Sequence, residues 1–341
     1  MKPFCSIVIR AYNEEKHIGR LLTGIQQQIL PTGKDSIQTI LVDSGSTDAT
    51  VSIARQYAVD IVHIPPQEFT FGRSLNLGIA QAKADLVVIA SAHVYPVYPD
   101  WLERLLAPFE DPQVALTYGK QRGAETSKYS EHQIFHHWFP DSSRTRQSLP
   151  FCNNANAAIR RSLWEEHPYD ETLPALEDLA WARWVHSENK GGVISYIAEA
   201  EIIHVHQETW RGIYNRYQRE AMAFKRIYPQ EHFRRWDMLR LWLGNSLNDM
   251  RIAAREHVLL REWRNILHFR WNQFSGTYQG YRSGQLTWQL KQTFYYPRAT
   301  EANLHPAQRA VAPIPYSDLA IPLHHQESYD SLAGKEESHH D

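Results

Sequence analysis

The hydrophobic and polar positions of the first ninety residues form short apolar runs that alternate with longer amphipathic runs. Four apolar, β-rich runs predict strands, at residues 4–12, 37–43, 60–65 and 85–91. Between them, apolar residues recur at helical spacing over residues 14–28, 46–58 and 72–82. Strands separated by helices imply right-handed crossovers, so this part is predicted to be an α/β fold whose mostly parallel central sheet is covered on both faces.

The pattern becomes less regular after residue 112. Further strands are predicted near residues 114–121, 153–161 and 200–206, with a helix over residues 178–189. Residues 209–292 have a largely helical pattern, and the chain after about residue 301 has no periodicity. The predicted division is an α/β domain over residues 1–206, a helical C-terminal region over residues 207–300, and a disordered or loosely packed tail over residues 301–341.

The charge of the chain is concentrated in its helical C-terminal region. The net charge is −2, but residues 207–300 carry 16 Lys+Arg and 7 Asp+Glu, and six of the eleven Trp. Residues 209–292 interleave Arg with Trp and Leu, as helices at a membrane surface do. Peripheral contact with an anionic membrane is therefore one expectation. The alternative expectation is that these aromatic residues pack on the α/β domain. No nucleic-acid partner is expected.

Three features bear on the cellular compartment. The chain has two cysteines, Cys5 and Cys152, and one bridge would matter little at this length, so a reducing compartment is expected. No run approaches the ~18 apolar residues that a membrane-spanning helix needs. The first residues lead directly into a strand and leave no room for a signal peptide. The protein is expected to be cytoplasmic, at most attached to a membrane surface.

The segment ILVDSGSTDAT carries the strongest sign of a ligand site. It places Asp43 at the carboxyl end of a strand, where ligands of parallel sheets bind, ahead of a tight turn into a helix. A carboxylate there can accept the imide N–H of a uracil or thymine ring. The segment AYNEE, with Tyr12, Asn13 and Glu14, ends the first strand and would form the facing wall of a nucleotide site. The alternative is that Asp43 and Asp48 only cap turns.

Several segments in a fixed order resemble a known family. SIVIRAYNEE, LVDSGSTDAT and GRSLNLGIAQAKADLVV look like family 2 glycosyltransferases with the GT-A nucleotide-sugar-binding fold, over about residues 4–206. EFTFGRSLN, SAHVYP, YGKQ and HVHQ look most like the rhamnosyltransferase-like subgroup. The resemblance implies an inverting transfer of a sugar from a nucleoside diphosphate of the UDP or dTDP type. The acceptor would be a hydroxyl of a glycan or a lipid-linked precursor.

The metal motif of that family is altered in this chain. Ser91-Ala92-His93 stands where the family has Asp-x-Asp, which holds a divalent metal. His93 can bind Mn²⁺ and similar ions, whereas Ser91 is a poor ligand and Mg²⁺ should bind less well than Mn²⁺. His204 and His206 are two residues apart on a predicted strand, so both can point at the diphosphate. Ordinary strand-end or surface histidines are the alternative for all three.

Arg73 and two groups of polar residues complete the candidate site. Arg73, at a predicted helix start, can meet phosphate charge, or it can be a solvated helix-end arginine. Glu177 and Asp178 begin a helix, and the resemblance makes Asp178 the general base; an acidic pair at a helix N-terminus is the alternative. The segment FCNNANAAIRR contains Asn153, Asn154 and Asn156. These asparagines are predicted to line the sugar pocket with Glu177; the alternative is that they make turns.

The altered metal motif leaves a second function open. A non-catalytic nucleotide-sugar-binding protein would also have lost Asp-x-Asp, but such a loss should relax Asp178 as well, and Asp178 is present. A nucleotidyltransferase would need a Gly-rich basic loop near the N-terminus, and AYNEEKH is not one. A glycosyltransferase that uses Mn²⁺ or Mg²⁺ is the favoured prediction.

Overall fold

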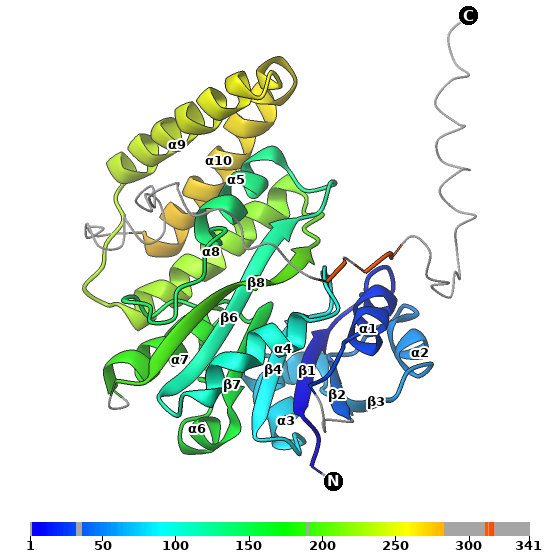
Figure 1. The fold of residues 1–341 in the computed structure, drawn as a ribbon. Helices are drawn as coiled ribbons and strands as arrows, with labels where there is room; N and C mark the ends of the chain where they lie inside the picture. The colour runs from blue at the N-terminus through cyan, green and yellow to red at the C-terminus, as the bar shows by residue number, and fades with distance from the viewer. Residues whose placement is uncertain (1, 32–35, 189–190, 283–310, 313, 317–341) are drawn as a thin grey trace, which may run out of the picture.

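An eight-stranded sheet runs through the centre of the protein, with helices on both of its faces (Figure 1). The computed structural model describes residues 2–31, 36–188, 191–282, 311–312 and 314–316. The strand order is β3-β2-β1-β4-β7-β6-β8-β5. The strands are β1 (Cys5–Ala11), β2 (Ile37–Asp43), β3 (Val59–His63), β4 (Leu86–Ser91), β5 (Val94–Pro96), β6 (Val114–Gly123), β7 (Asn156–Arg160) and β8 (Val193–His204).

The first four strands form the parallel half of the sheet that the sequence predicts. β1 lies between β2 and β4, and β3 follows β2, with all three pairings parallel. β7 pairs antiparallel with both β4 and β6, and β5 pairs antiparallel with β8. β6 and β8 are again parallel, so four of the seven pairings are parallel. The carboxyl ends of β1, β2 and β4 therefore meet at one edge.

Two hydrophobic cores, one on each face, hold the helices to the sheet. Alternate residues of β1 point to opposite faces: Ile7 and Ile9 pack with α1, α2 and α4, whereas Val8 packs with α3, α5 and α7. The helices of this part are α1 (Ile18–Gln26), α2 (Thr50–Ala54), η1 (Pro66–Glu68), α3 (Phe71–Ala80), α4 (Trp101–Leu106), η2 (Ala107–Glu110), α5 (Tyr129–Trp138), α6 (Arg161–Glu166), α7 (Glu177–Arg183) and the π-helix η3 (Trp184–Glu188).

The structure adds elements that the sequence pattern missed. β5, α4, α5 and α6 were not predicted, and β8 begins at Val193, seven residues before the predicted strand. α5 was missed because its buried face carries the polar residues Ser130 and Glu131 beside Phe135. The early part of β8 is buried on both faces, so it lacks the alternation that identifies a half-exposed strand.

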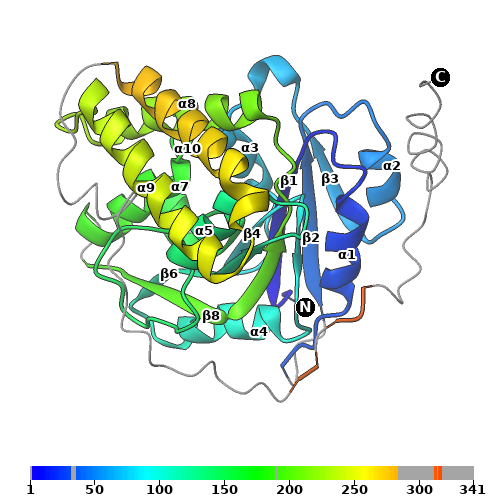
Figure 2. The same ribbon diagram turned by 90° about the horizontal axis from the view of Figure 1, so that it is seen from above.

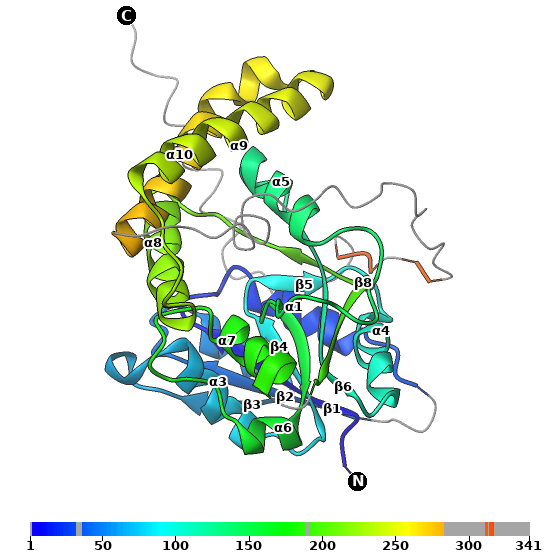
Figure 3. The ribbon, with the colours of Figure 1, turned by 90° about the vertical axis from the view of Figure 1, so that its left-hand side faces the viewer.

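Three helices follow the sheet, as predicted, and form a layer of their own (Figures 2 and 3). They are α8 (Trp210–Ile227), α9 (Arg235–Arg255) and α10 (Leu259–Tyr281). A third core joins them to each other and to the start of α7, through Phe224, Phe233, Leu241 and Phe274. None of the described helices is long and apolar enough to cross a bilayer. Residues 283–300 of the predicted helical region lie outside the described residues.

A short piece of the predicted tail is packed against the sheet. The backbone N–H of Ile314 donates to the carbonyl of Val97 at 2.9 Å, and the hydroxyl of Tyr316 bonds to the carbonyl of Pro96. The ring of Tyr316 also meets that of Tyr95 edge-on. Apart from residues 311–312 and 314–316, residues 301–341 lie outside the described residues.

Candidate functional site

An open cleft lies at the carboxyl-terminal edge of the central strands. Its walls come from the ends of β1 and β4, the loop before β7, the start of α7, the end of β8 and one face of α8. The predicted residues that line it are Glu14, Ser91, His93, Asn153, Asn154, Glu177, Asp178, His204 and His206. The α/β domain and the helical C-terminal region therefore both contribute side chains to one site.

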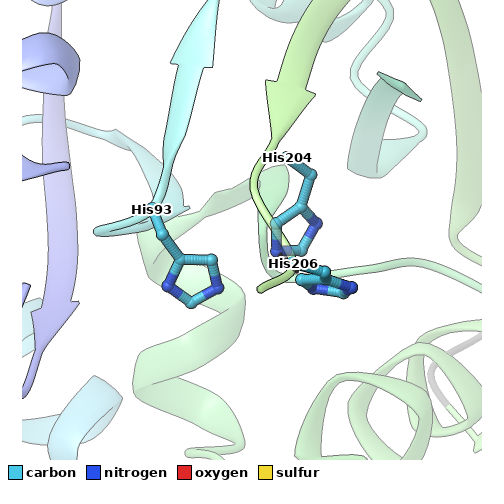
Figure 4. A group of neighbouring side chains, drawn as sticks. All are labelled: His93, His204 and His206. Carbon is cyan, nitrogen blue, oxygen red and sulfur yellow. Dashed lines mark hydrogen bonds between the residues drawn. The ribbon is translucent and has the colours of Figure 1, made fainter. Parts of the chain in front are cut away.

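Three histidines converge in this cleft (Figure 4). β5 pairs with the end of β8 so that Val94 faces His204, which brings His93 beside the two histidines of the HVH segment. The ring centroid of His93 is 5.1 Å from that of His204 and 6.0 Å from that of His206. One ligand nitrogen of each lies within 4.8 Å of the others, which is a spacing that a single metal ion can bridge.

Each histidine presents the same nitrogen to the centre of the group. The Nδ1 atoms lie 2.7 Å from Glu14 Oε1, 2.8 Å from Gln121 Oε1 and 2.9 Å from Glu131 Oε1, for His93, His204 and His206 respectively. These oxygens accept, so each Nδ1 carries a proton and donates it. In its neutral form, an imidazole with this proton has its lone pair on Nε2. Such outer hydrogen bonds fix the tautomer and orientation of metal-binding histidines.

A contact between two of these nitrogens favours a proton or a metal ion shared by the pair. The Nε2 atoms of His204 and His206 are 2.9 Å apart. Two lone pairs at that distance repel, and either a proton on one nitrogen or a metal ion shared by both removes the repulsion. Burial, followed by the charges of His206 and His93, lowers the pKa of His204 well below its ordinary value, which keeps His204 neutral. The group therefore fits a divalent metal ion of the kind that imidazole binds, such as Mn²⁺ or Zn²⁺.

A buried ion pair holds His206 in place. Both oxygens of Glu131 accept from Nη2 of Arg216 at 3.0 Å, and Glu131 is 3% exposed. Burial alone would raise the pKa of this carboxyl, but Arg216 and His206 outweigh it and lower the pKa to about 2. Glu131 is thus ionised, and its charge orients the Nδ1–H of His206. Because Glu131 lies on the unpredicted α5 and Arg216 on α8, no local pattern pointed to either.

Asp178 lies at the first turn of α7, with its carboxyl facing the cleft. One oxygen accepts the N–H of Asn154 at 3.1 Å and the other that of Leu179 at 2.8 Å. Burial and the adjacent charge of Glu177 raise the pKa of Asp178 to about 7. Leu176, which precedes this turn, has φ +58°, an uncommon conformation for leucine that aims the acidic pair inward. A carboxyl of this kind can accept a proton near neutral pH.

Glu177 has a different environment from its neighbour. It is 4% exposed and accepts a hydrogen bond at 2.9 Å from Arg10, at the end of β1. The side chain of Asn154 also approaches it, at 3.4 Å. Glu177 is therefore paired, whereas Asp178 has no basic side chain bonded to it among the described residues. This difference makes Asp178 the better base of the two.

The two loops predicted to form a nucleotide site lie side by side. Ala11 pairs with Asp43 at the strand ends, and Asn13 exchanges hydrogen bonds with the following turn, to Ser46 at 2.9 Å and from Thr47 at 2.8 Å. Tyr12 is 57% exposed above them. The carboxylate of Asp43 accepts the N–H groups of Gly45 and Ser46 and contacts His63. Asp43 therefore does cap the turn, and Asp48 caps the next one.

Besides Tyr12, Asn13 and Asp43 of the adjacent loops, two more predicted site residues do not line the cleft. Arg73 does begin a helix, but its guanidinium bonds to Glu68 at 2.8 Å and Glu171 at 3.4 Å and does not line the cleft. Because two carboxylates already pair with Arg73, its contact with phosphate remains a prediction that this conformation does not support. Asn156 is fully buried and bonds to Trp101 and to the carbonyl of Ala200. It fixes the sheet and cannot reach a sugar.

Two arginines that the sequence did not single out face the cleft instead. The guanidinium carbons of Arg10 and Arg219 each lie 4.9 Å from the centroid of the Phe71 ring. Arg10 is paired with Glu177, but Arg219 forms no ion pair with any carboxylate of the described residues. Arg219 comes from α8, so only the tertiary structure brings it to the strand ends. It is the best placed source of uncompensated positive charge in this wall.

The cleft continues into a recess between α5 and the helical C-terminal region. The recess shares Asn153, His206 and Glu220 with the cleft. Its further walls are aromatic, from Phe135, Trp138, Phe139, Phe151, Phe224 and Tyr281. The rings of Trp138 and Phe151 stack, 4.8 Å apart. Aromatic faces with a few polar groups are suited to binding a ring that has both apolar and hydroxyl surfaces.

Comparison with known proteins gives a consistent result. The family model Glycosyl transferase family 2 matches residues 6–167. The O-antigen chain rhamnosyltransferase RfbN of Salmonella typhimurium is 28% identical over 62% of this chain and 69% of its own length. The O-antigen chain rhamnosyltransferase WbaN of Salmonella anatum is 31% identical over 53% of this chain, which spans 60% of WbaN.

Two solved structures share the fold at low sequence identity. The mannosyltransferase PcManGT from Pyrobaculum calidifontis, in complex with GDP-Man and Mn²⁺, superposes with a TM-score of 0.57 at 18% identity. That superposition covers 82% of this chain and 87% of PcManGT. S. aureus TarS 1-349 in complex with UDP-GlcNAc gives a TM-score of 0.51 at 16% identity, over 82% of this chain and 91% of TarS 1-349.

Proposed function

Because the glycosyltransferase family 2 model matches residues 6–167 and the fold is the GT-A fold, we propose that the chain transfers one sugar, with inversion, from a pyrimidine nucleoside diphosphate to an acceptor hydroxyl. The observation that carries the proposal is the cleft that both Asp178 and the three converging histidines line. The two rhamnosyltransferase relatives support a rhamnosyl group as the transferred sugar and a glycan or lipid-linked acceptor. The α/β part, up to the end of β8, would be the catalytic domain.

The proposed reaction needs a proton acceptor and a site for the leaving group. Asp178 accepts the proton of the acceptor hydroxyl as its oxygen attacks the anomeric carbon, and the bond from that carbon to the diphosphate oxygen breaks. The loops at Asp43 and Asn13 hold the nucleoside, and the aromatic recess beyond His206 holds the acceptor. Arg219 faces the diphosphate. Attack from the side opposite the leaving group inverts the anomeric configuration.

The histidine group fits the divalent metal of this proposal. Nε2 of His93, His204 and His206 would hold the ion, with Ser91 in the cleft but outside the group. When bound, it would offset the negative charge that develops on the departing diphosphate. Neutral imidazole ligands favour Mn²⁺ over Mg²⁺. The bound Mn²⁺ of PcManGT supports this assignment.

The proposal is tested by incubating the purified chain with UDP-, dTDP- and GDP-sugars, with and without Mn²⁺. We expect slow hydrolysis of a UDP- or dTDP-sugar that Mn²⁺ stimulates, and faster turnover when a glycan acceptor is added. Binding of a nucleotide sugar without hydrolysis or transfer under any metal would favour the non-catalytic alternative.

The nucleoside is expected to be a pyrimidine that Asp43 recognises. Calorimetry should show tighter binding of UDP or dTDP than of GDP, and Asp43→Ala should lose most of that binding. Asp48→Ala is the matched control, because Asp48 caps the adjacent turn through Thr50. Equal losses in the two variants would mean that Asp43 acts only through the turn, and equal binding of GDP would exclude pyrimidine selection.

Arg219 is expected to contact the diphosphate. A hydrogen bond to a charged group contributes about 1.5–3 kcal/mol, so Arg219→Ala should weaken UDP binding by about 10- to 100-fold. Binding of uridine should not change, and Arg219→Lys should restore part of the affinity. Arg211→Ala, an exposed arginine on the same helix, is the control. An Arg219→Ala variant that binds UDP like the wild type would remove Arg219 from the site.

A further inference from the structure

Helices α9 and α10 form a hairpin with exposed apolar side chains. Seven of the eleven large hydrophobic side chains exposed in the described chain lie on it. They are Trp236, Leu239, Leu243 and Leu247 on α9 and Leu260, Trp263 and Trp271 on α10. On α10, half-buried Leu267 lies between Trp263 and Trp271 in the same row. In each helix the spacing is i, i+3, i+7 and i+11, which forms one continuous stripe.

The two stripes lie on the same side of the hairpin. The helices are antiparallel, because only three residues separate the end of α9 at Arg255 from the start of α10 at Leu259. They pack together through Asp249 and Arg270, at 2.8 Å, and through Trp242 and the carbonyl of Leu267, at 3.2 Å. At about 100° per residue, the stripe of α9 is rotated by roughly 80–160° from Asp249, and that of α10 by roughly 20–100° from Arg270, in the same sense. In an antiparallel pair, rotation in the same sense places both stripes on one face. The edge-on contact of Trp242 and Trp271 joins them.

Basic side chains surround these stripes. Eight arginines of this region are exposed: Arg234, Arg235, Arg240, Arg251, Arg255, Arg261, Arg264 and Arg282. The only fully exposed carboxylate on the described residues of the hairpin is Glu256. Asp237 and Glu262 are half-buried, and Asp249 is buried in its pair with Arg270. The hairpin thus combines exposed Trp and Leu side chains with a strongly positive border.

We propose that this face of the α9–α10 hairpin docks on the surface of an anionic phospholipid bilayer. Trp and Leu would enter the interfacial layer, and the arginines would contact phosphate headgroups. A second copy of the chain is a poorer occupant, because pairing the face with itself would press arginines against arginines. α10 packs along α8, which supplies Arg216, Arg219 and Glu220 to the cleft. Docking therefore suits a lipid-linked acceptor, a consequence that rests on the proposed function.

The experiment measures sedimentation of the full chain with two kinds of vesicle. One is phosphatidylcholine alone, and the other is phosphatidylcholine mixed with phosphatidylglycerol. We expect at least tenfold tighter binding to the anionic vesicles, weakened by salt. Each basic residue at an anionic surface contributes about fivefold, so the triple variant R240Q/R251Q/R264Q should lose on the order of 100-fold. The pair W236A/L243A should also lose binding.

The controls separate this proposal from the catalytic one. I29A/L149A removes two exposed apolar side chains elsewhere and should bind vesicles like the wild type. UDP binding, measured on the same samples, should be unchanged in every variant because none of these residues lines the cleft. Vesicle binding that the hairpin variants leave intact would overturn the proposal, as would equal binding to neutral vesicles. A wild-type dimer that the hairpin variants dissociate, without vesicle binding, would assign the face to self-association instead.

Discussion

Replacing Asp178 with asparagine is expected to lower the rate of sugar transfer by about 10²- to 10⁴-fold, the usual loss when a positioned base is removed. The asparagine keeps the size of the side chain and one acceptor oxygen for the N–H groups of Asn154 and Leu179. The cleft should therefore stay in place, and nucleotide affinity should remain within a few-fold of the wild type. Initial rates and calorimetry on the same samples measure both.

A nearby aspartate provides the matched control. Asp170 caps a turn through Thr172 eight residues earlier and does not line the cleft. Asp170→Asn should therefore transfer sugar at the wild-type rate. If Asp178→Asn also retained that rate, the base would lie elsewhere. Glu220 would be the next candidate, because it lines the cleft and burial raises its pKa to about 7.

The raised pKa of Asp178 gives this prediction a pH dependence. A base acts in its ionised form, so transfer should be slow below the pKa of about 7 and should rise as pH passes through it. Glu177 and Arg10 are the charged groups that act on this carboxyl, and Cys152 and Tyr169 are the other titratable groups close to it. Glu177→Gln removes a negative charge and should move the midpoint to lower pH. A midpoint that does not move would mean that another group titrates.

Removing the imidazole of His93 is expected to produce the second large loss. Disturbing even the outer hydrogen bonds of a metal ligand typically costs 10- to 100-fold in metal affinity or activity, so His93→Ala should cost at least that much. His93 is the most accessible of the three histidines, and its loss leaves the buried pair of His204 and His206 packed. Electron paramagnetic resonance of Mn²⁺ measures binding directly, independently of transfer.

The metal preference and a distant histidine complete this test. Activity should be higher with Mn²⁺ than with Mg²⁺ in the wild type, and His93→Ala should flatten that difference. His136→Ala, on the exposed side of α5, should change neither binding nor activity. Full activity in the presence of a chelator, together with a silent His93→Ala, would make the site metal-free. Arg219 would then be the main positive group facing the diphosphate.

Elements with a local pattern follow from the amino-acid sequence alone. The parallel half of the sheet could be predicted because each strand is a short apolar run and each helix repeats its apolar residues at helical spacing. The placement of Asp178 at a helix start and of His204 and His206 two residues apart also follows from neighbouring residues. The expected roles of these groups came from the resemblance to family 2 glycosyltransferases, whose motifs occur in this sequence in the same order.

Which residues meet at the site depends on the packing of distant elements. The Nδ1 partners of the histidines are 79, 83 and 75 residues away along the chain, in Glu14, Gln121 and Glu131. Arg73 and Asn156 had suitable chemistry and suitable positions near strand or helix ends, yet carboxylates neutralise Arg73 and the sheet buries Asn156. Arg219 reaches the cleft because α8 packs against the α/β domain. The periodicity of apolar residues indicates which face of a helix or strand is buried. The partner of a side chain depends instead on how distant elements pack, and no local pattern contains that information.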